Sequence, residues 1–404
     1  MKLLHALFSP LLAVALAAQS PATISIGTWN LEFLGSPGNY RQDLPPRDDA
    51  DYAAIGARIR ELGVAVLAVQ EVNDAPSLQK VAEGAGPSWR SLVGTTGTWD
   101  DGVTAQRLGF LWDSAVVELL GAEELLDLPR EAEGVPIFHR VPITAWFQVT
   151  DTGFDFRVVT VHLKAGRKDK DLEKRRLEAT ALHQWLGLLR RTPNEDQDFV
   201  VLGDFNSSYG ADPERILERG DVVRFVDQPK AQATIQHFDE PIDQIAAGPG
   251  FAELRRDSYR VHGEHGGLDK QAWRKVYSDH YAVTVSVDAA VDADPTATFT
   301  HGGPEHALPA ERRPVASTST SPTTTSPTPA TAMAAPAARR ASTVSTAWPP
   351  QVGALVQVRV LDGTHVLGRL QRPLPEGPDG WVVIEAEGSV RAVPLRQVAW
   401  INLQ

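Results

Sequence analysis

The chain has 404 residues, of which 42% are hydrophobic, so it is long enough to bury a sizeable core and to hold more than one domain. It contains no cysteine, which excludes disulfides, zinc–thiolate sites and a thiol nucleophile. The formal net charge of −12 argues against a tight, nonspecific binder of nucleic acid, because affinity for polyanions comes mainly from lysine and arginine.

Residues 1–21 predict a signal peptide. A basic start at Lys2 is followed by an almost wholly apolar run from Ala6 to Ala18, and Ala15-Leu16-Ala17 is a candidate cleavage motif. The run falls short of the ~20 apolar residues that a membrane-spanning helix needs. We therefore expect a secreted or periplasmic protein without a stable membrane anchor, and the lack of cysteine in an exported chain indicates a bacterial source.

Residues 22–288 predict a layered α/β domain. Apolar runs typical of strands cover 23–28, 64–69, 108–112, 156–161, 199–201 and 281–285, and helical patterns cover 51–62 and 171–189. Strands that alternate with helices and hairpins are typical of sheets covered by helices.

The composition changes after this domain. Residues 289–350 are dominated by Ala, Thr, Ser and Pro, which predicts a disordered linker. Residues 351–404 predict an all-β module, with strand patterns over 355–360, 365–370, 380–384 and 390–393 and a turn signal at Asp362-Gly363. The module resembles a small SH3-like barrel. We expect it to bind cell wall, another polymer or a protein, or to dock on the larger domain.

Polar residues interrupt or end several of the apolar runs in the larger domain. Because each strand end delivers functional groups to one edge of a sheet, we expect these side chains to share a face. The strings are Trp29-Asn30-Leu31-Glu32, Gln70-Glu71, His162-Leu163-Lys164, Gly203-Asp204-Phe205-Asn206, Pro241-Ile242-Asp243 and Ser278-Asp279-His280.

This ordered set resembles the endonuclease/exonuclease/phosphatase superfamily, the group that contains deoxyribonuclease I. The resemblance implies a four-layer α/β sandwich of two packed β-sheets flanked by helices, with an active site at one end. Two strings depart from subgroups of the family. His162-Leu163-Lys164 stands where abasic-site endonucleases have Tyr-x-Pro-Asn, and the string around Asp243 lacks the Trp, Cys and Arg of inositol polyphosphate phosphatases.

Hydrolysis of a phosphodiester requires a metal ion, a base that activates water, and stabilisation of the leaving oxygen. Glu71 is the expected metal ligand, and Glu32 and Asp279 are additional or alternate ligands. Their hard oxygen atoms favour Mg²⁺, with Mn²⁺ or Ca²⁺ as alternatives. The alternative for Glu71 is a solvated carboxylate at a strand end.

The resemblance implies that His280 contacts the scissile phosphate and that Asp243 orients and charges it. Asp204 is then the general base or orients the water. Asn206 and Asn30 hold the phosphate, and His162 contacts it from the side opposite His280. Turn and cap chemistry is the alternative for these Asp and Asn residues, and organisation of Glu71 is the alternative for Asn30.

Further basic residues are candidates for phosphate or substrate binding: Arg107, Arg140 and Lys164. For the two arginines a structural salt bridge is the alternative. The basic run from Lys164 to Lys170, with Arg175 and Arg176, predicts either a solvated helix face or a clamp on the nucleic-acid backbone.

The expected function is metal-dependent hydrolysis of phosphodiester bonds, with nucleic acid as the substrate. Two alternatives stay open, namely a phospholipid hydrolase of the sphingomyelinase type or another phosphoester hydrolase, and an inactive binding protein. The motifs do not distinguish DNA from RNA or endonuclease from exonuclease action, and nothing in the sequence predicts an oligomeric state.

Overall fold

The structure is a computed structural model that describes residues 23–308, with short gaps, and the backbone of five strands between 355 and 403. The gaps are 36–40, 42–43, 100–103, 130, 133–134, 209, 230–231, 291, 294, 296 and 300–305. The predicted signal peptide and residues 309–350 of the predicted linker lie outside the described residues. Within the described part, no helix combines the length and the apolar content needed to cross a bilayer.

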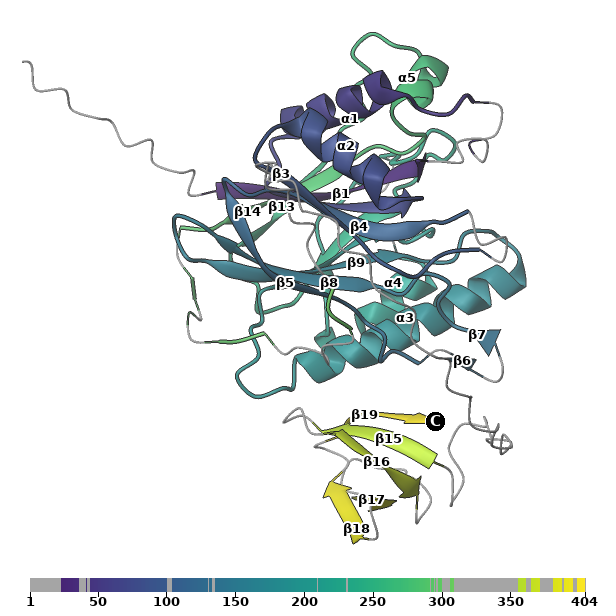
Figure 1. The fold of residues 1–404 in the computed structure, drawn as a ribbon, viewed down its shortest axis with the longest axis vertical. Helices are drawn as coiled ribbons and strands as arrows, with labels where there is room; N and C mark the ends of the chain where they lie inside the picture. Colours follow the sequence, from purple (N-terminus) through teal and green to yellow (C-terminus); the bar gives the residue numbers. More distant parts are fainter. Residues whose placement is uncertain are drawn as a thin grey trace, which may run out of the picture.

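Two six-stranded sheets pack face to face at the centre of the larger domain (Figure 1). The first contains β1 (Thr23–Leu34), β2 (Val66–Val72), β3 (Trp89–Val93), β4 (Arg107–Asp113), β13 (Leu254–Val261) and β14 (Val283–Asp288), in the order β13-β14-β1-β2-β4-β3. The second contains β5 (Val117–Glu124), β8 (Ile143–Val149), β9 (Asp155–His162), β10 (Phe199–Asp204), β11 (Arg224–Phe225) and β12 (Asp243–Ala247), in the order β11-β12-β10-β9-β8-β5.

Helices cover the outer faces of both sheets (Figure 1). On the first sheet lie α1 (Asp49–Leu62) and α2 (Ala75–Ala85), and α5 (Lys270–Val276) contacts α1. On the second sheet lie α3 (Asp169–Leu189) and α4 (Asp212–Leu217), followed by a 3₁₀ turn over Arg219–Asp221. A short hairpin of β6 (Glu131–Ala132) and β7 (Val135–Pro136) stands apart from both sheets. The predicted four-layer α/β sandwich is therefore confirmed.

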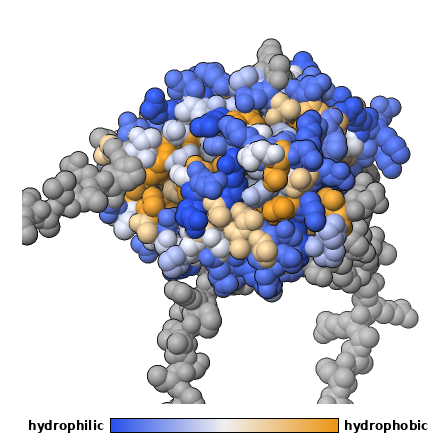
Figure 2. All heavy atoms as spheres, turned by 90° about the horizontal axis from the view of Figure 1, so that it is seen from above, coloured by the Kyte–Doolittle hydropathy of each residue, from blue (hydrophilic) through white to orange (hydrophobic). Residues whose placement is uncertain are grey.

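Seen from above, on the side of α1, α2 and α5, the surface is mostly hydrophilic (Figure 2). Apolar residues gather there in small groups between polar ones. This distribution is what a helical layer facing solvent usually shows.

Strand β10 shows why the apolar runs of the sequence form buried strands. All six of its residues are buried, and their side chains alternate between two cores. Val200 and Leu202 belong to the core between the sheets, whereas Phe199 and Val201 pack with residues of α3 such as Leu186. A strand covered on both faces needs apolar residues at every position, which explains the unbroken run.

The strand register brings the polar residues of the motifs to one end of the sandwich. β1 runs parallel to β2, and β9 runs parallel to β10, where His162 is paired with Asp204. β12 runs antiparallel to β10, so its first residue, Asp243, also pairs with Asp204. The fully buried Gln70 links the sheets, because its Nε2 donates to Thr160 Oγ1 of β9 over 3.0 Å.

The described residues at the start of the predicted linker pack against the larger domain. Phe299 is buried and stacks on Trp146, and the Arg157 guanidinium lies over both rings. The N–H of the buried Leu308 donates to the carbonyl of Ala122 in β5 over 2.8 Å. The domain thus includes the described residues up to Leu308, while the division of the rest of the chain stays a prediction.

The C-terminal residues form a five-stranded sheet of β15 (Leu355–Val360), β16 (His365–Leu370), β17 (Trp381–Ala386), β18 (Ser389–Pro394) and β19 (Val398–Leu403). Their order is β18-β17-β16-β15-β19, with antiparallel pairing throughout. The first four overlap the predicted strands, and β19 is additional. The SH3-like resemblance and the ligand of this module stay predictions.

Candidate active site

The end of β10 contains a glycine that no other residue can replace without a shift of the backbone. Gly203 has a φ of 147°, and a Cβ atom there would lie 2.0 Å from the carbonyl oxygen of Val161. Asn206 also has a positive φ of 51°, and its backbone N–H donates to Asp204 Oδ1 over 2.8 Å. This tight turn fixes the orientation of the Asp204 carboxylate.

Asp204 lies at the centre of the site. It is 1% exposed, and its Oδ2 accepts a hydrogen bond from Asn30 Nδ2 over 3.1 Å. The same oxygen lies 3.3 Å from His162 Nε2 and 3.9 Å from His280 Nε2. Burial raises the pKa of Asp204 to about 7, and the negative charge of Asp243 adds to this effect, although His280 opposes it. A carboxylate with a pKa near neutrality is suited to general base catalysis.

His280 and Asp243 form a buried pair. His280 Nδ1 lies 2.8 Å from Asp243 Oδ2, and both residues are buried. Burial by itself lowers the pKa of His280, but the carboxylates of Asp243, Asp204 and Asp279 outweigh it and hold the pKa well above its usual value. This shift favours the protonated ring, the imidazolium, and Asp243 fixes its orientation.

The backbone on both sides of this pair is tied down. The N–H of Asp243 donates to Thr234 Oγ1 over 3.0 Å, and the Tyr259 hydroxyl donates to the carbonyl of Asp243 over 2.9 Å. Trp29 Nε1 donates to the carbonyl of His280 over 3.0 Å. These bonds hold the imidazolium at a fixed place in the site.

His162 lies between Asp204 and Glu71. Its Nε2 is 3.8 Å from Glu71 Oε1, in addition to its contact with Asp204. Burial, and then the positive charge of Arg140, hold the pKa of His162 well below its usual value, so the ring is neutral. Within the described structure its buried Nδ1 has no hydrogen-bond partner.

Arg140 supports the end of β9. Its Nε donates to the carbonyl of His162 over 2.8 Å, and its Nη2 donates to the carbonyl of Leu163 over 3.0 Å. Its Nη1 donates to Gln106 Oε1 over 2.8 Å. This buried arginine positions His162, and its predicted binding of phosphate stays a prediction.

Glu71 has a partly exposed carboxylate with a raised pKa. Its side chain is 13% exposed, it has a φ of 60°, and its Oε2 accepts from the N–H of Phe33 over 3.2 Å. Burial, and then the negative charge of Asp279, raise the pKa of Glu71. Two acidic groups that repel one another are stabilised by a shared cation, and their oxygen atoms suit Mg²⁺. The donor set at Glu71 and Asp279 therefore fits the predicted metal.

Glu32 is engaged with the segment that precedes His280. Its Oε1 accepts from Arg274 Nε over 2.7 Å, and its Oε2 accepts from the N–H of Asp279 over 3.2 Å. The Arg41 guanidinium lies 3.8 Å from the same carboxylate. Glu32 thus orients the Asp279 backbone, and its role as a metal ligand stays a prediction.

A cluster of three residues in the described part of the chain has ligand atoms close enough to hold a metal ion. Asp204, Asp243 and His280 offer atoms that all lie within 4.8 Å of one another. However, His280 Nδ1 is already bonded to Asp243, and Mg²⁺ prefers oxygen to nitrogen. These contacts favour an acid–base cluster at this position, and the metal site at Glu71 stays a prediction.

The remaining candidates differ in how they contribute. Asn30 joins the acidic groups, because its Oδ1 accepts from the N–H of Glu32 over 2.9 Å while its Nδ2 binds Asp204. Arg107 donates to the Asn73 carbonyl over 2.8 Å and so holds a neighbouring loop. Lys164 Nζ lies 3.3 Å from Asp171 Oδ1. The structure thus brings together seven of the predicted residues, Asn30, Glu71, His162, Asp204, Asn206, Asp243 and His280.

Several supporting residues carry no signal in the sequence. Thr234 and Tyr259 lie outside the motifs, in segments without a strong pattern, so only their contacts with Asp243 identify them. By contrast, Ser278 belongs to the string Ser278-Asp279-His280. Its hydroxyl donates to the carbonyl of Asn30 over 2.7 Å and accepts from the N–H of His280 over 3.0 Å.

Comparisons with known proteins find similarity over the larger domain. A family model described as the endonuclease/exonuclease/phosphatase family matches residues 27–280. A protein of Thioalkalivibrio sp. (strain K90mix) named deoxyribonuclease is 28% identical over 204 residues, which are 49% of this chain and 50% of that protein. The chain thus spans about half the length of the curated relative it matches.

Three solved structures are similar in fold. The human Nocturnin catalytic domain with a bound sulfate anion is 14% identical, with 66% of this chain and 94% of that chain covered at a TM-score of 0.45. A mannosyl-6-phosphatase of Bacteroides thetaiotaomicron is 17% identical, with 65% and 98% covered at a TM-score of 0.45. D. rerio TDP2 complexed with a single-strand DNA product is 16% identical, with 65% and 98% covered at a TM-score of 0.44.

Proposed function

Because the chain belongs to the endonuclease/exonuclease/phosphatase family, we propose that it is an exported, metal-dependent phosphodiesterase, and specifically a nuclease. The observation that carries this proposal is the buried Asp204, whose pKa of about 7 suits a base, beside the charged pair of His280 and Asp243. The relative named deoxyribonuclease supports nucleic acid as the substrate. The predicted signal peptide supports export.

In this proposal Asp204 accepts the proton of the attacking water. The water oxygen forms a bond to phosphorus while the bond from phosphorus to the leaving oxygen breaks. The hydrogen bonds from Asn30 and from the N–H of Asn206 hold the carboxylate in place, so its position does not change as the proton arrives. His162 lies on the other side of Asp204, with its Nε2 3.3 Å from the same carboxylate.

His280 stabilises the negative charge that builds up on the phosphate oxygens. Its Nδ1–H is bound to Asp243, so the Nε2–H remains to donate to a phosphate oxygen beside Asp204. A positive charge fixed in advance in a buried site lowers the barrier more than a mobile one in water.

Glu71, with Asp279 beside it, would hold the metal ion, for which Mg²⁺ is the first choice and Mn²⁺ or Ca²⁺ are alternatives. When bound, the ion supplies positive charge for a nonbridging phosphate oxygen. Glu32 would help to position Asp279 through its bond to the backbone N–H of that residue.

The experiment that tests the function compares DNA, RNA and sphingomyelin side by side in Mg²⁺. The expected result is cleavage of at least one nucleic acid, lost on addition of EDTA. Activity on sphingomyelin alone would replace the nuclease with a phospholipid hydrolase. Absence of cleavage of all three, with intact folding, would favour a binding protein without activity.

A further inference from the structure

A pocket of about 870 Å³ opens beside the candidate active site. Two of its lining residues, Asn206 and Ile242, directly adjoin the site: Asn206 binds Asp204, and Ile242 precedes Asp243. Its volume falls within the range of about 300–1,000 Å³ that ligand pockets usually have. The pocket is therefore placed to hold whatever group adjoins the phosphate at Asp204.

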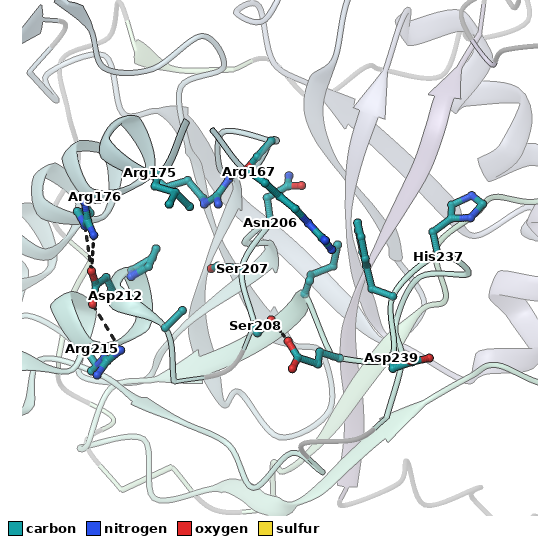
Figure 3. A pocket seen from close by; sticks show the side chains of 17 residues that line it. Arg167, Arg175, Arg176, Asn206, Ser207, Ser208, Asp212, Arg215, His237 and Asp239 are labelled. Carbon is teal, nitrogen blue, oxygen red and sulfur yellow. Dashed lines mark hydrogen bonds and ion pairs between the residues drawn. The ribbon is translucent and has the colours of Figure 1, made fainter. Parts of the chain in front are cut away.

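One wall of the pocket is basic. It is formed by α3, α4 and the loop that precedes α3, as Figure 3 shows for Arg167, Arg175, Arg176 and Arg215. Arg176 and Arg215 both contact the carboxylate of Asp212, at 2.8 Å and 3.5 Å, and Arg176 also lies 3.2 Å from Glu173. The charges of these two arginines are thus balanced locally, and the exposed Arg167 provides positive charge on this wall. A wall of this kind suits the phosphates of a nucleic-acid strand.

Arg175 shapes the loop of this wall. It is 4% exposed, and its Nη1 donates to the carbonyls of Lys164 and Gly166. It thereby fixes the segment that carries Arg167. Gly166 permits the bend, because its φ is 110°.

The opposite wall comes from residues 237–242 and provides an aromatic surface. The Arg167 guanidinium lies 4.4 Å from the ring centroid of the half-buried Phe238, which joins the two walls. The neighbouring Asp239 and Glu240 are acidic, and Glu240 accepts a hydrogen bond from the Ser208 hydroxyl (Figure 3). Phosphate is thus favoured on the α3 side, and an uncharged planar group is favoured near Phe238.

We propose that this pocket binds the nucleotide next to the scissile phosphate, with its base stacked on the Arg167 guanidinium that Phe238 supports from the other side. A base can stack in this way only when it has left the double helix, so the favoured substrate is single-stranded nucleic acid. This inference rests on the proposed nuclease function and narrows its substrate class.

The test compares two substrates in Mg²⁺: a single-stranded DNA oligonucleotide, and methyl p-nitrophenyl phosphate, which has no nucleoside to place in the pocket. The measured quantity is the ratio of their kcat/KM values. In Phe238→Ala and Arg167→Ala this ratio should fall on the order of tenfold, the size of one base–aromatic stack. Arg167→Lys should also lower it because the charge stays but the plane is lost, whereas Phe238→Trp should retain it.

Arg58→Ala is the matched control, since Arg58 also lies over an aromatic ring, that of Trp273, but in the α1 and α5 layer. An unchanged ratio in Phe238→Ala and Arg167→Ala would overturn the inference, and so would a ratio in Arg167→Lys equal to that of the wild type. Preference of the wild type for duplex over single-stranded DNA would overturn it as well.

A second measurement separates failure of this inference from failure of the proposed function. Binding of a fluorescein-labelled single-stranded oligonucleotide is followed by anisotropy in EDTA, where no cleavage is expected. Weaker binding to Phe238→Ala than to the wild type and to Arg58→Ala supports the pocket even if neither substrate is hydrolysed. Equal binding by all three proteins, or no binding, contradicts it.

Discussion

The pair of Asp243 and His280 gives the most informative mutation. Asp243→Asn keeps the size of the side chain and leaves the backbone bonds of Asp243 to Thr234 and Tyr259 in place. It removes the negative charge that lies 2.8 Å from His280 Nδ1. Without this charge, burial lowers the pKa of His280, so the imidazolium loses its proton at a lower pH.

The size of the effect follows from the bond that is lost. A hydrogen bond between charged groups contributes about 1.5–3 kcal/mol. If His280 stabilises the transition state only as the imidazolium, kcat falls by roughly 10- to 150-fold at neutral pH. The alkaline limb of the pH–rate profile, which reports loss of the His280 proton, therefore shifts to lower pH.

The assay measures initial rates of DNA cleavage from acid to alkaline pH for the wild type and for Asp243→Asn. Asp257→Asn is the matched control, since Asp257 is exposed. Thermal unfolding checks that the variants fold. A kcat for Asp243→Asn within twofold of the wild type, with an unshifted alkaline limb, would refute the role assigned to the charged pair.

Further predictions concern the turn after β10, a buried carboxyl and the Asn30 link. Gly203→Ala should lower Tm clearly, because the new Cβ atom would lie 2.0 Å from the Val161 carbonyl oxygen. Gly153→Ala is the control, since Gly153 also has a positive φ but no atom within 4 Å of the new Cβ, so its free energy of unfolding should fall by only about 1 kcal/mol. Equal Tm values for the two variants would contradict this. Burial raises the pKa of Glu178 to about 7, above its value of 4.5 in the unfolded chain. The contribution of this carboxyl to the free energy of unfolding is therefore fully present below pH 4.5 and is lost as the pH rises through 7. Between pH 5 and pH 8, the free energy of unfolding measured in urea should fall by up to about 3 kcal/mol more for the wild type than for Glu178→Gln. Equal falls in the two proteins would contradict the raised pKa of Glu178. Asn30→Ala should reduce kcat with little change in KM, since Asn30 holds the carboxylate of Asp204, whereas a rise in KM alone would indicate phosphate binding.

The sequence predicted the strand ends of the site well, for a physical reason. A strand buried on both faces is an unbroken apolar run, so a polar residue such as Asp204 or His162 marks its end. Parallel strands end at the same edge, and this explains why these two residues become partners in the register of β9 and β10.

The roles of charged residues were harder to predict from the sequence. A buried arginine bound to carbonyl groups and an arginine that binds phosphate have the same side chain, so Arg140 could be assigned only from its contacts with His162 and Leu163. Glu32 likewise resembles a metal ligand in sequence, although its oxygens bind Arg274 and the N–H of Asp279.

Contacts between distant segments were not predictable from local patterns. The bond from Gln70 to Thr160 joins two sheets, and nothing in the string Gln70-Glu71 identifies that partner. Phe299 and Leu308 stand in a stretch with few apolar residues, so the average composition predicted a linker where single side chains pack on the domain.

Metal-dependent hydrolysis at Glu71 and Asp204 is the core of the proposed function. The most direct test measures the rate of DNA cleavage as a function of Mg²⁺ concentration for the wild type and for Glu71→Gln. We predict a saturable rate for the wild type that EDTA abolishes, and for Glu71→Gln a rate lower by on the order of 100-fold that requires more Mg²⁺. Cleavage that persists in EDTA, or the same Mg²⁺ dependence in both proteins, would contradict the account.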